Sequence, residues 1–259
     1  MAVTNFIQQI WSKKIQDDLE LKCKLVDNCL RDYEGDCQYA QSVKILGVGE
    51  PTIGDYTGAD ITIEEMNDKG QVLTIDQAKY FAFYVDDVDK AQSVPGLPEK
   101  YQEKAVHGLA VARDTYVATL IQGATNKTTV TMTEEGFKKG IDDAIVELRE
   151  RNFDEEGVIE ITPAGYALFK NHLITLSTNN PEYIKKGIVG MYDNMEVIMS
   201  NNLKTPGCVR GKKAIAFVGQ INKVEALRAE KKFCDIIRGL DTFGAKVIDE
   251  NRIQVLVAG

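Results

Sequence analysis

One stretch of the sequence has the period-two alternation of a long β-strand, and it reads Gln71-Val-Leu-Thr-Ile-Asp-Gln-Ala-Lys-Tyr-Phe-Ala-Phe-Tyr-Val-Asp-Asp-Val88. Successive side chains of a strand point to opposite faces, so the residues divide into two sets. One face carries Leu73, Ile75, Phe81, Phe83 and Val85, and the other carries Val72, Thr74, Ala78, Tyr80 and Tyr84. Because most of these residues are β-branched or aromatic, the sequence predicts a strand with apolar residues on both faces.

The residues just before this stretch predict a β-hairpin. Ala59-Asp-Ile-Thr-Ile-Glu-Glu65 alternates Ile61 and Ile63 with polar neighbours, and Asn67-Asp-Lys-Gly70 supplies residues that favour a turn. The whole ribbon would lie within residues 43–94.

The predicted ribbon is too long for the domain that carries it. A strand from Gln71 to Val88 would extend roughly 60 Å, whereas a compact domain made of the remaining residues has a radius of gyration of about 15 Å. We therefore expect the ribbon to overhang its domain, and its apolar faces then need a neighbouring subunit to cover them. The alternative is a strand that breaks at Gln77–Lys79 and folds back into an ordinary sheet.

The composition is that of a globular protein with an excess of acidic residues. The formal net charge is -8 and the pI is about 5.0, which argues against a protein that grips nucleic acid phosphates. A container wall, by contrast, should repel packed DNA. The sequence has no apolar run long enough to span a membrane, and its first residues lack the apolar core of a signal peptide. We expect the protein to be made and kept in a cytosol.

Helical patterns flank the ribbon. Residues Phe6 to Leu30 repeat apolar side chains at helical spacing, with Trp11 and Ile15 in the apolar ladder. Further helices are expected from Pro98 to about Gln122 and from Thr133 to Arg151. Strands are expected at Ser42–Leu46, Val158–Thr162, Glu196–Ser200, Ala214–Val218 and, around a turn, within Lys246–Val257. Because helices and strands do not alternate regularly, the predicted fold class is α+β.

No motif for catalysis or cofactor binding fits the sequence. The glycine-rich run from Gly47 to Gly54 fails the dinucleotide fingerprint, because Thr52 stands where the third glycine belongs. The 2 histidines and 5 cysteines, which include no Cys-x-x-Cys pair, leave little material for a triad or a metal site. Acidic clusters such as Asp154-Glu-Glu156 are interpreted as solvated faces. We expect no enzyme and no catalytic, cofactor-binding or metal-binding residue, and a cytosolic α+β hydrolase that uses a carboxylate cluster stays open as the alternative.

The order of several segments carries a family resemblance. These segments are Asn5-Phe-Ile-Gln-Gln-Ile-Trp-Ser12, Asp32-Tyr-Glu-Gly35, the ribbon from Thr74 to Gln92, the run from Gly187 to Leu203, and the ending Phe243-Gly-Ala-Lys-Val-Ile248. Together they resemble the major capsid (coat) proteins of tailed double-stranded-DNA bacteriophages. The resemblance extends over essentially the whole chain.

The resemblance implies the α+β phage capsid fold first described for phage Hong Kong ninety-seven. Its expected parts are an N-terminal arm at 1–40, an extended β-hairpin loop at 41–78, a peripheral domain at 79–175 with a long spine helix at about 98–122, an axial domain at 176–238, and strands that return to the peripheral domain at 239–259. Such a protein would self-assemble through hexamers and pentamers into the icosahedral shell of a virion. An encapsulin-like bacterial compartment shell is the alternative within the same fold.

Partners and contact residues follow from the same resemblance. The partners would be other copies of the chain, a separate scaffolding protein and a portal, and the shell would enclose double-stranded DNA without sequence-specific binding. Assembly would take place in the bacterial host cytoplasm, without a membrane. The residues expected at contacts between subunits are Trp11, Ile15, Ile61, Ile63, Asn67, Asp68, Lys69 and Gly70. Removing residues 1–39, or the loop tip 67–70, should abolish assembly while the compact domain stays folded.

Overall fold

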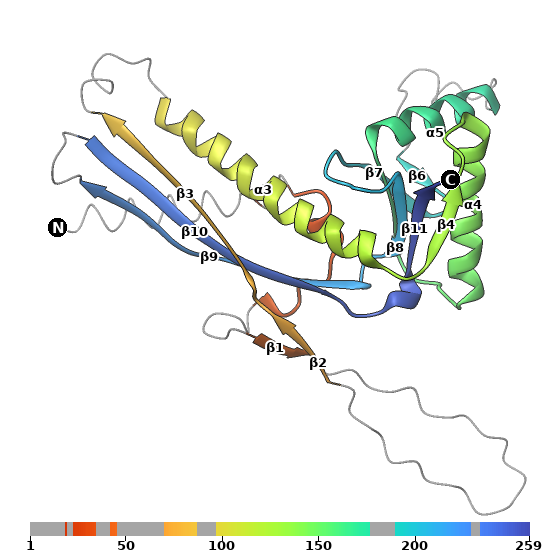
Figure 1. Cartoon of the computed structure of the whole chain (residues 1–259), viewed down its shortest axis with the longest axis horizontal. Coiled ribbons are helices and arrows are strands. Elements are labelled where there is room, and N and C mark those ends of the chain that lie inside the picture. The colour runs from red at the N-terminus through yellow and green to blue at the C-terminus, as the bar shows by residue number, and fades with distance from the viewer. Residues whose placement is uncertain are drawn as a thin grey trace, which may run out of the picture.

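One half of the molecule is a long helix that lies along a long three-stranded sheet (Figure 1). The computed structural model describes residue 19 and residues 23–34, 42–45, 70–86, 97–176, 190–228 and 234–259. The helix is α3 (Leu97–Gly123), and the antiparallel sheet has the order β3-β10-β9, with β3 at Gln77–Asp86, β10 at Cys234–Val247 and β9 at Ile215–Arg228. We call this half the elongated unit.

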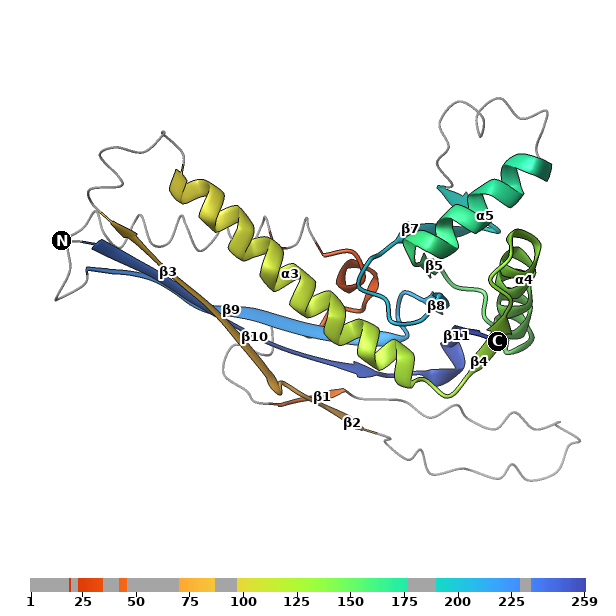
Figure 2. The ribbon, with the colours of Figure 1, turned by 45° about the horizontal axis from the view of Figure 1, so that its top comes forward.

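The other half, the compact unit, is a six-stranded mixed sheet with two helices (Figure 2). Its strand order is β4-β11-β8-β5-β7-β6, with β4 at Lys127–Val130, β5 at Gly157–Ile161, β6 at Met191–Tyr192, β7 at Met195–Met199, β8 at Gly207–Gly211 and β11 at Ile253–Ala258. Helix α4 (Glu134–Glu150) packs on β4 and β11, and α5 (Pro163–Leu176) packs against α4. The short 3-10 helix η3 (Glu250–Arg252) precedes β11. This mixture of helices and sheets confirms the predicted α+β class.

Local sequence signals account for the helices. The N-cap of α4 is Thr133, whose hydroxyl accepts a hydrogen bond from the backbone N–H of Gly136 at 3.2 Å. The predicted apolar stripe of α4, Phe137, Ile141, Ile145 and Leu148, is buried. The predicted helix at about 98–122 is confirmed as α3. Helix α4 therefore follows from its cap and its apolar period.

The stretch from residue 71 to 88 is not one strand. It forms β2 (Gln71–Thr74), which pairs with β1 (Ser42–Ile45), and β3, which pairs with β10. The prediction of a continuous strand is wrong, because the chain changes partner at Ile75 and Asp76. The alternative of a break is confirmed, although the break lies just before the predicted position at Gln77–Lys79. The side chain of Asp76 accepts a hydrogen bond from the hydroxyl of Tyr116 at 2.9 Å, which ties this break to α3.

The longest strands, β9 and β10, were not predicted from the sequence. The predicted strand that corresponds to β9 stops at Val218. Charged residues interrupt the apolar alternation on the outer side of the sheet, Glu225 in β9 and Arg238 in β10. The pairing of β9 and β10 with β3 divides the predicted axial segment 176–238 between the two units. Strand β10 also runs straight through the predicted domain boundary after residue 238.

The N-terminal helix ends earlier than predicted. Leu19 is helical and fully buried, but residues 26–28 form a 3-10 turn, η1 (Val26–Asn28), and Leu30 makes a parallel bridge to Ala216 of β9. The rest of the predicted helix lies outside the described residues. Residues 23–34 therefore belong to the folded body, and a freely removable arm could comprise at most the residues before Leu19.

Apolar side chains from both units fill the core. One cluster joins α3 and β9 to the N-terminal segment and to β8 and β11, and its members include Leu19, Leu25, Val26, Val106, Val117, Ile121, Cys208, Ile215, Phe217, Phe243 and Val255. A second cluster lies between α4, α5 and the six-stranded sheet and includes Phe137, Ile141, Leu148, Ile159, Ile161, Phe169 and Val209. The first cluster thus spans the junction between the two units.

Two glycine-to-alanine substitutions should have opposite effects on stability. A Cβ at Gly244 in β10 would lie 2.2 Å from the backbone carbonyl oxygen of Thr74, whereas a Cβ at Gly108 in α3 would meet nothing within 4 Å. We expect G244A to lower the free energy of unfolding by about 2 kcal/mol or more through overpacking. G108A should raise it by about 0.5–1 kcal/mol through helix propensity. Urea unfolding followed by circular dichroism measures both, and equal values for the two variants would contradict the close crossing at Gly244.

Candidate functional site

The structure places one of the predicted subunit-contact residues. Gly70 is exposed and directly precedes β2, and a Cβ on it would lie 2.7 Å from Cε of Lys44, so a glycine lets the Lys44 side chain cross the strand end. The others, Trp11, Ile15, Ile61, Ile63, Asn67, Asp68 and Lys69, lie outside the described residues. Their roles at subunit contacts stay predictions.

The base of the predicted extended loop is a two-stranded ladder. Ser42 pairs with Thr74, and Ile45 pairs with Gln71, so the segment between β1 and β2 starts and ends at neighbouring positions of one ladder. Buried side chains of this ladder pack on Ala216 and Val218 of β9. The loop is therefore anchored in the elongated unit by an apolar contact.

The outer face of the three-stranded sheet, on the side away from α3, exposes aromatic and aliphatic side chains. Tyr80 is 80% exposed and Tyr84 is 72% exposed, and Leu227 and Leu240 are also exposed. The sequence assigned both tyrosines to one face, and their alternation with the half-buried Phe81 confirms that assignment. Large exposed apolar side chains that gather on one face are typical of a protein contact surface.

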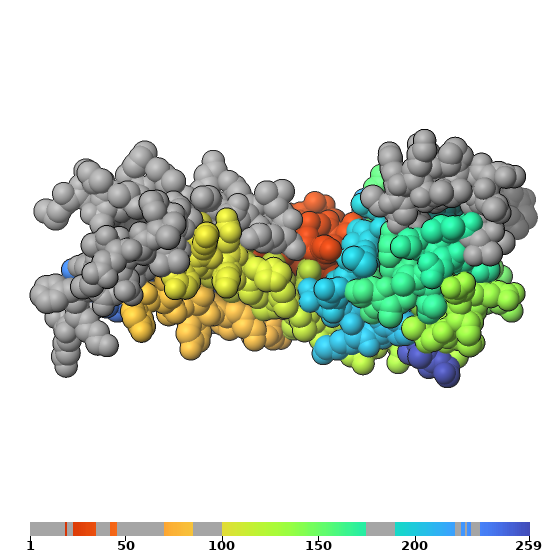
Figure 3. All heavy atoms as spheres, turned by 90° about the horizontal axis from the view of Figure 1, so that it is seen from above, coloured from red at the N-terminus to blue at the C-terminus, as the bar shows by residue number. Residues whose placement is uncertain are grey.

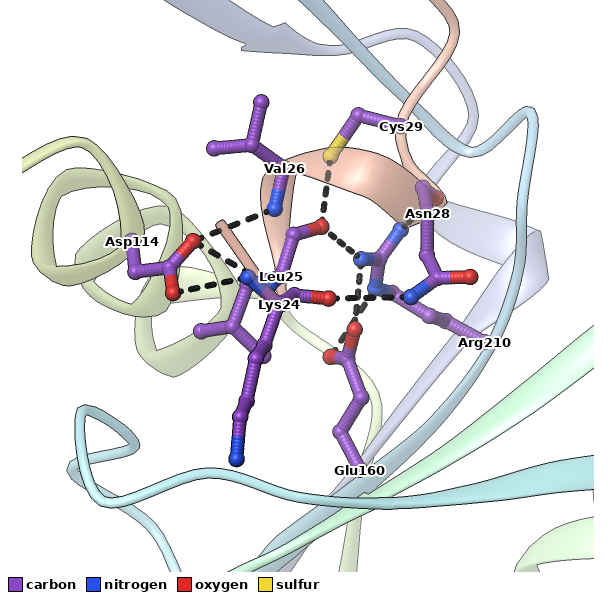
Figure 4. Close-up of polar contacts among 8 residues, drawn as sticks. All are labelled: Lys24, Leu25, Val26, Asn28, Cys29, Asp114, Glu160 and Arg210. Atoms are coloured by element: carbon purple, nitrogen blue, oxygen red, sulfur yellow. Dashed lines mark hydrogen bonds and ion pairs between the residues drawn. The ribbon is translucent and has the colours of Figure 1, made fainter. Parts of the chain in front are cut away.

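A buried carboxylate holds the segment at which the N-terminal helix ends (Figure 4). Asp114 of α3 accepts hydrogen bonds from the backbone N–H groups of Lys24 at 3.0 Å, Leu25 at 3.1 Å and Val26 at 3.2 Å. The amide of Asn202 donates to the same carboxylate at 3.4 Å. Burial raises the pKa of Asp114, and these hydrogen bonds oppose that rise. Because the carboxylate takes these N–H groups, the chain turns here instead of continuing as a helix.

A buried ion pair holds the other side of the same segment (Figure 4). Arg210 of β8 and Glu160 of β5 are fully buried and form a bidentate pair at 2.6 and 3.1 Å. The Arg210 guanidinium also donates to the carbonyl oxygens of Asn28 at 2.7 Å and Leu25 at 2.9 Å. Five backbone groups of residues 24–28 are thus bonded to Asp114 or Arg210. We call this set of contacts the arm anchor.

Sequence reasoning missed the arm anchor, although a signal for it was present. Glu160 interrupts the apolar run Val158-Ile-Glu-Ile161, and Arg210 interrupts Gly207-Cys-Val-Arg-Gly211, so each is a lone charge in a strand that is otherwise apolar. Two lone charges of opposite sign in buried strands indicate a pair. Nothing local to the sequence shows that the N-terminal segment supplies the remaining hydrogen-bond partners.

A second buried pair fastens α3 to the long sheet. Arg113 donates to both carboxylate oxygens of Asp241 in β10, at 2.5 and 2.9 Å. The guanidinium also lies 5.6 Å from the ring centroid of Phe217 and 5.9 Å from that of Phe243. Consecutive residues of α3, Arg113 and Asp114, therefore bind the sheet and the N-terminal segment respectively.

Two carboxylates of a groove in the compact unit, Asp142 and Asp193, are paired with cations. An open groove of about 510 Å³ beside α4 contains Asp142 and Asp193. Asp142 pairs with Lys138 and accepts from the hydroxyl of Tyr192 at 2.6 Å, and Asp193 pairs with Arg149 at 2.8 Å. These pairs account for the acidic residues of the groove without a catalytic role.

The described cysteines are free and buried. Burial raises the pKa of Cys23 to about 12 and that of Cys29 to about 11, so both thiols stay protonated at neutral pH. Within the described ranges, no group of three His, Cys, Asp or Glu residues could hold a metal ion, and no helix is long and apolar enough to cross a membrane.

Solved structures from phages match this chain over most of its length. A structure from Mycobacterium phage Che8 matches over 90% of this chain and 90% of its own, with a TM-score of 0.78 and 27% identity. The capsid structure of the cyanophage P-SCSP1u matches over 89% and 86%, with a TM-score of 0.73 and 17% identity. The chain has the Hong Kong ninety-seven-type fold of phage major capsid proteins. The crystal structure of a virus-like particle from Pyrococcus furiosus also matches, over 96% of this chain and 99% of its own, with a TM-score of 0.63 and 14% identity.

The matches to phage structures come from comparing three-dimensional structures. No protein-family model matches the sequence, and no curated protein sequence matches it either. The long helix α3 of the capsid fold stands where the sequence predicted the spine helix.

Replacing Arg210 should be far more damaging than replacing an exposed arginine of the same fold. In R210M, Glu160 loses its cation in a fully buried site, so we expect the free energy of unfolding to fall by about 3–5 kcal/mol. The control is R238Q, which removes an ion pair whose arginine is 57% exposed and should cost less than about 1 kcal/mol. Chemical denaturation at pH 7 compares the two.

The pH dependence of R210M should identify Glu160 as the cause. Burial raises the pKa of Glu160 in the folded chain, and Arg210 opposes that rise, so the pKa rises further in R210M. Because the pKa of Glu160 is higher in folded than in unfolded R210M, the folded state binds the proton more tightly. The free energy of unfolding of R210M therefore falls as pH increases. The deficit of R210M relative to the wild type should therefore shrink toward acidic pH, and a deficit that does not depend on pH would contradict this assignment.

Proposed function

We propose that this chain is a major capsid protein that self-assembles through hexamers and pentamers into the icosahedral shell of a virion. The observation that carries this proposal is the similarity to phage capsid chains over nine-tenths of the length, at 27% identity in the case of Mycobacterium phage Che8. The shell encloses double-stranded DNA, and the net charge of -8 suits a wall that does not bind the packed phosphates.

The described surfaces suit a protein that acts by contacting copies of itself. The ladder of β1 and β2 anchors both ends of the predicted extended loop, and the outer face presents Tyr80 and Tyr84. Tyrosine is favoured at protein contacts because it buries a large area while its hydroxyl keeps a hydrogen-bond partner. We propose that the predicted residues Trp11, Ile15, Ile61, Ile63 and 67–70 make contacts of the same kind.

We also propose domain boundaries that differ from those predicted. The elongated unit is the peripheral domain with α3 as its spine helix, and the compact unit is the axial domain. On this assignment the axial domain comprises residues 127–211 together with 253–258, and residues 215–247 belong to the peripheral domain. A separate scaffolding protein, a portal and assembly in the host cytoplasm complete the proposal.

An encapsulin-like compartment shell is the second candidate. It is favoured by the match to the Pyrococcus furiosus virus-like particle, which covers nearly the full length of both chains. Both candidates assemble shells, and they differ in content. Particles isolated from the natural source should hold double-stranded DNA if the chain is a phage capsid protein, and a folded cargo protein if it is a compartment shell.

Shell formation and its loss in matched deletions test the proposal. The purified chain should form capsomers or closed shells by negative-stain electron microscopy. Deleting residues 1–18, or residues 67–69, should abolish shells while the circular dichroism spectrum and the unfolding midpoint stay close to those of the full chain. These deletions spare Leu19 and Leu25, which are fully buried. A monodisperse monomer by light scattering, under all conditions that assemble related shells, would instead favour the hydrolase alternative.

A further inference from the structure

The N-terminal segment of residues 23–34 lies between the two units. Seen from above, it fills the space between α3 on one side and the strands and helices of the compact unit on the other (Figure 3). Its first residues carry buried apolar side chains, with Leu25 fully buried, Val26 2% exposed and Cys29 8% exposed. These side chains pack in the cluster that spans the junction of the units.

Each unit binds the segment through a different buried charge. On the side of the elongated unit, Asp114 accepts from the backbone N–H groups of residues 24–26. On the side of the compact unit, Arg210 donates to the carbonyl oxygens of Leu25 and Asn28. The backbone N–H of Leu25 is therefore bonded to one unit and its carbonyl oxygen to the other.

These bonds cannot be released one at a time without a large cost. If the segment left Asp114, a buried carboxylate would lose three donors, and if it left Arg210, a buried guanidinium would lose two acceptors. The direct polar contacts between the units include one from Nζ of Lys204 to the hydroxyl of Thr119 at 3.0 Å, which is exposed, and one from the Asn202 amide to Asp114 at 3.4 Å. The bonds of residues 24–28 to Asp114 and Arg210 add buried, charged hydrogen bonds to the apolar cluster that the units share.

We propose that residues 24–28 are a mechanical coupling between the N-terminal arm and the relative placement of the two units. A displacement of the arm moves this segment, and the segment carries α3 and β8 with it. The coupling needs no ligand, because each unit presents its own buried charge to the same peptide group. The consequence for an assembled shell rests on the proposed function. In such a shell, a neighbouring copy that holds the arm would set the angle between the two units.

The test uses the unassembled chain, so its outcome is separate from that of shell formation. The variant D114N keeps the size of the side chain but replaces one acceptor oxygen with a donor that faces N–H groups. Hydrogen exchange of the Leu25 and Val26 amides should accelerate by at least about tenfold, as expected for the loss of a charged hydrogen bond. The distance distribution between spin labels at exposed positions 79 of β3 and 139 of α4 should broaden or shift at the same time. The labelled variants carry C37S, which removes the one cysteine outside the described residues, and the four described cysteines are buried.

The matched control is R238Q, which removes an exposed ion pair of the long sheet and should change neither measurement. If D114N accelerates exchange at residues 24–26 while the distance distribution stays that of the wild type, the segment is a tether and the proposal is overturned. If D114N does not fold, native-state exchange of the wild-type chain in rising denaturant decides. The amides of Leu25 and Val26 should then open together with those of β8, and separate openings would overturn the coupling.

Discussion

The guanidinium of Arg210 lies fully buried at a point where three distant parts of the chain meet, and its charge has to be compensated there. Glu160 of β5 supplies the opposite charge, and the carbonyl oxygens of Leu25 and Asn28 accept further N–H groups of the guanidinium. A buried charge without partners is strongly unfavourable, so these elements can pack only in an arrangement that brings all of the partners together. The pair therefore specifies one position for the N-terminal segment, whatever its net contribution to stability.

The same rule of paired buried charges organises the elongated unit. Arg113 on α3 is matched by Asp241 on β10, and the next helix residue, Asp114, is matched by backbone N–H groups. One turn of a single helix thus binds both the long sheet and the N-terminal segment. Because the buried face of the sheet is committed to α3, the opposite face with Tyr80 and Tyr84 is left for contacts outside the unit.

An assembling protein benefits from this division of roles. The apolar clusters and the buried ion pairs hold the described elements together, while the outer face with Tyr80 and Tyr84 stays exposed. If residues 24–28 couple the two units as proposed, a neighbouring copy would change the angle between the units. A shell built from both hexamers and pentamers would require such a change of angle of identical chains.

The sequence by itself determined the elements whose signals are local. The cap and apolar stripe of α4, the position of α3, the two faces of β3 and the α+β class were readable from local spacing. The order of several segments carried the resemblance to phage capsid proteins. Tertiary structure alone decided where the stretch at 71–88 breaks, that β9 and β10 are the longest strands, and that residues 23–30 leave the helix. The physical reason is that these features depend on partners far away in sequence. A strand with a charged outer side is stable only beside its neighbours, and a helix ends at Cys23 because Asp114, some ninety residues later, takes its N–H groups.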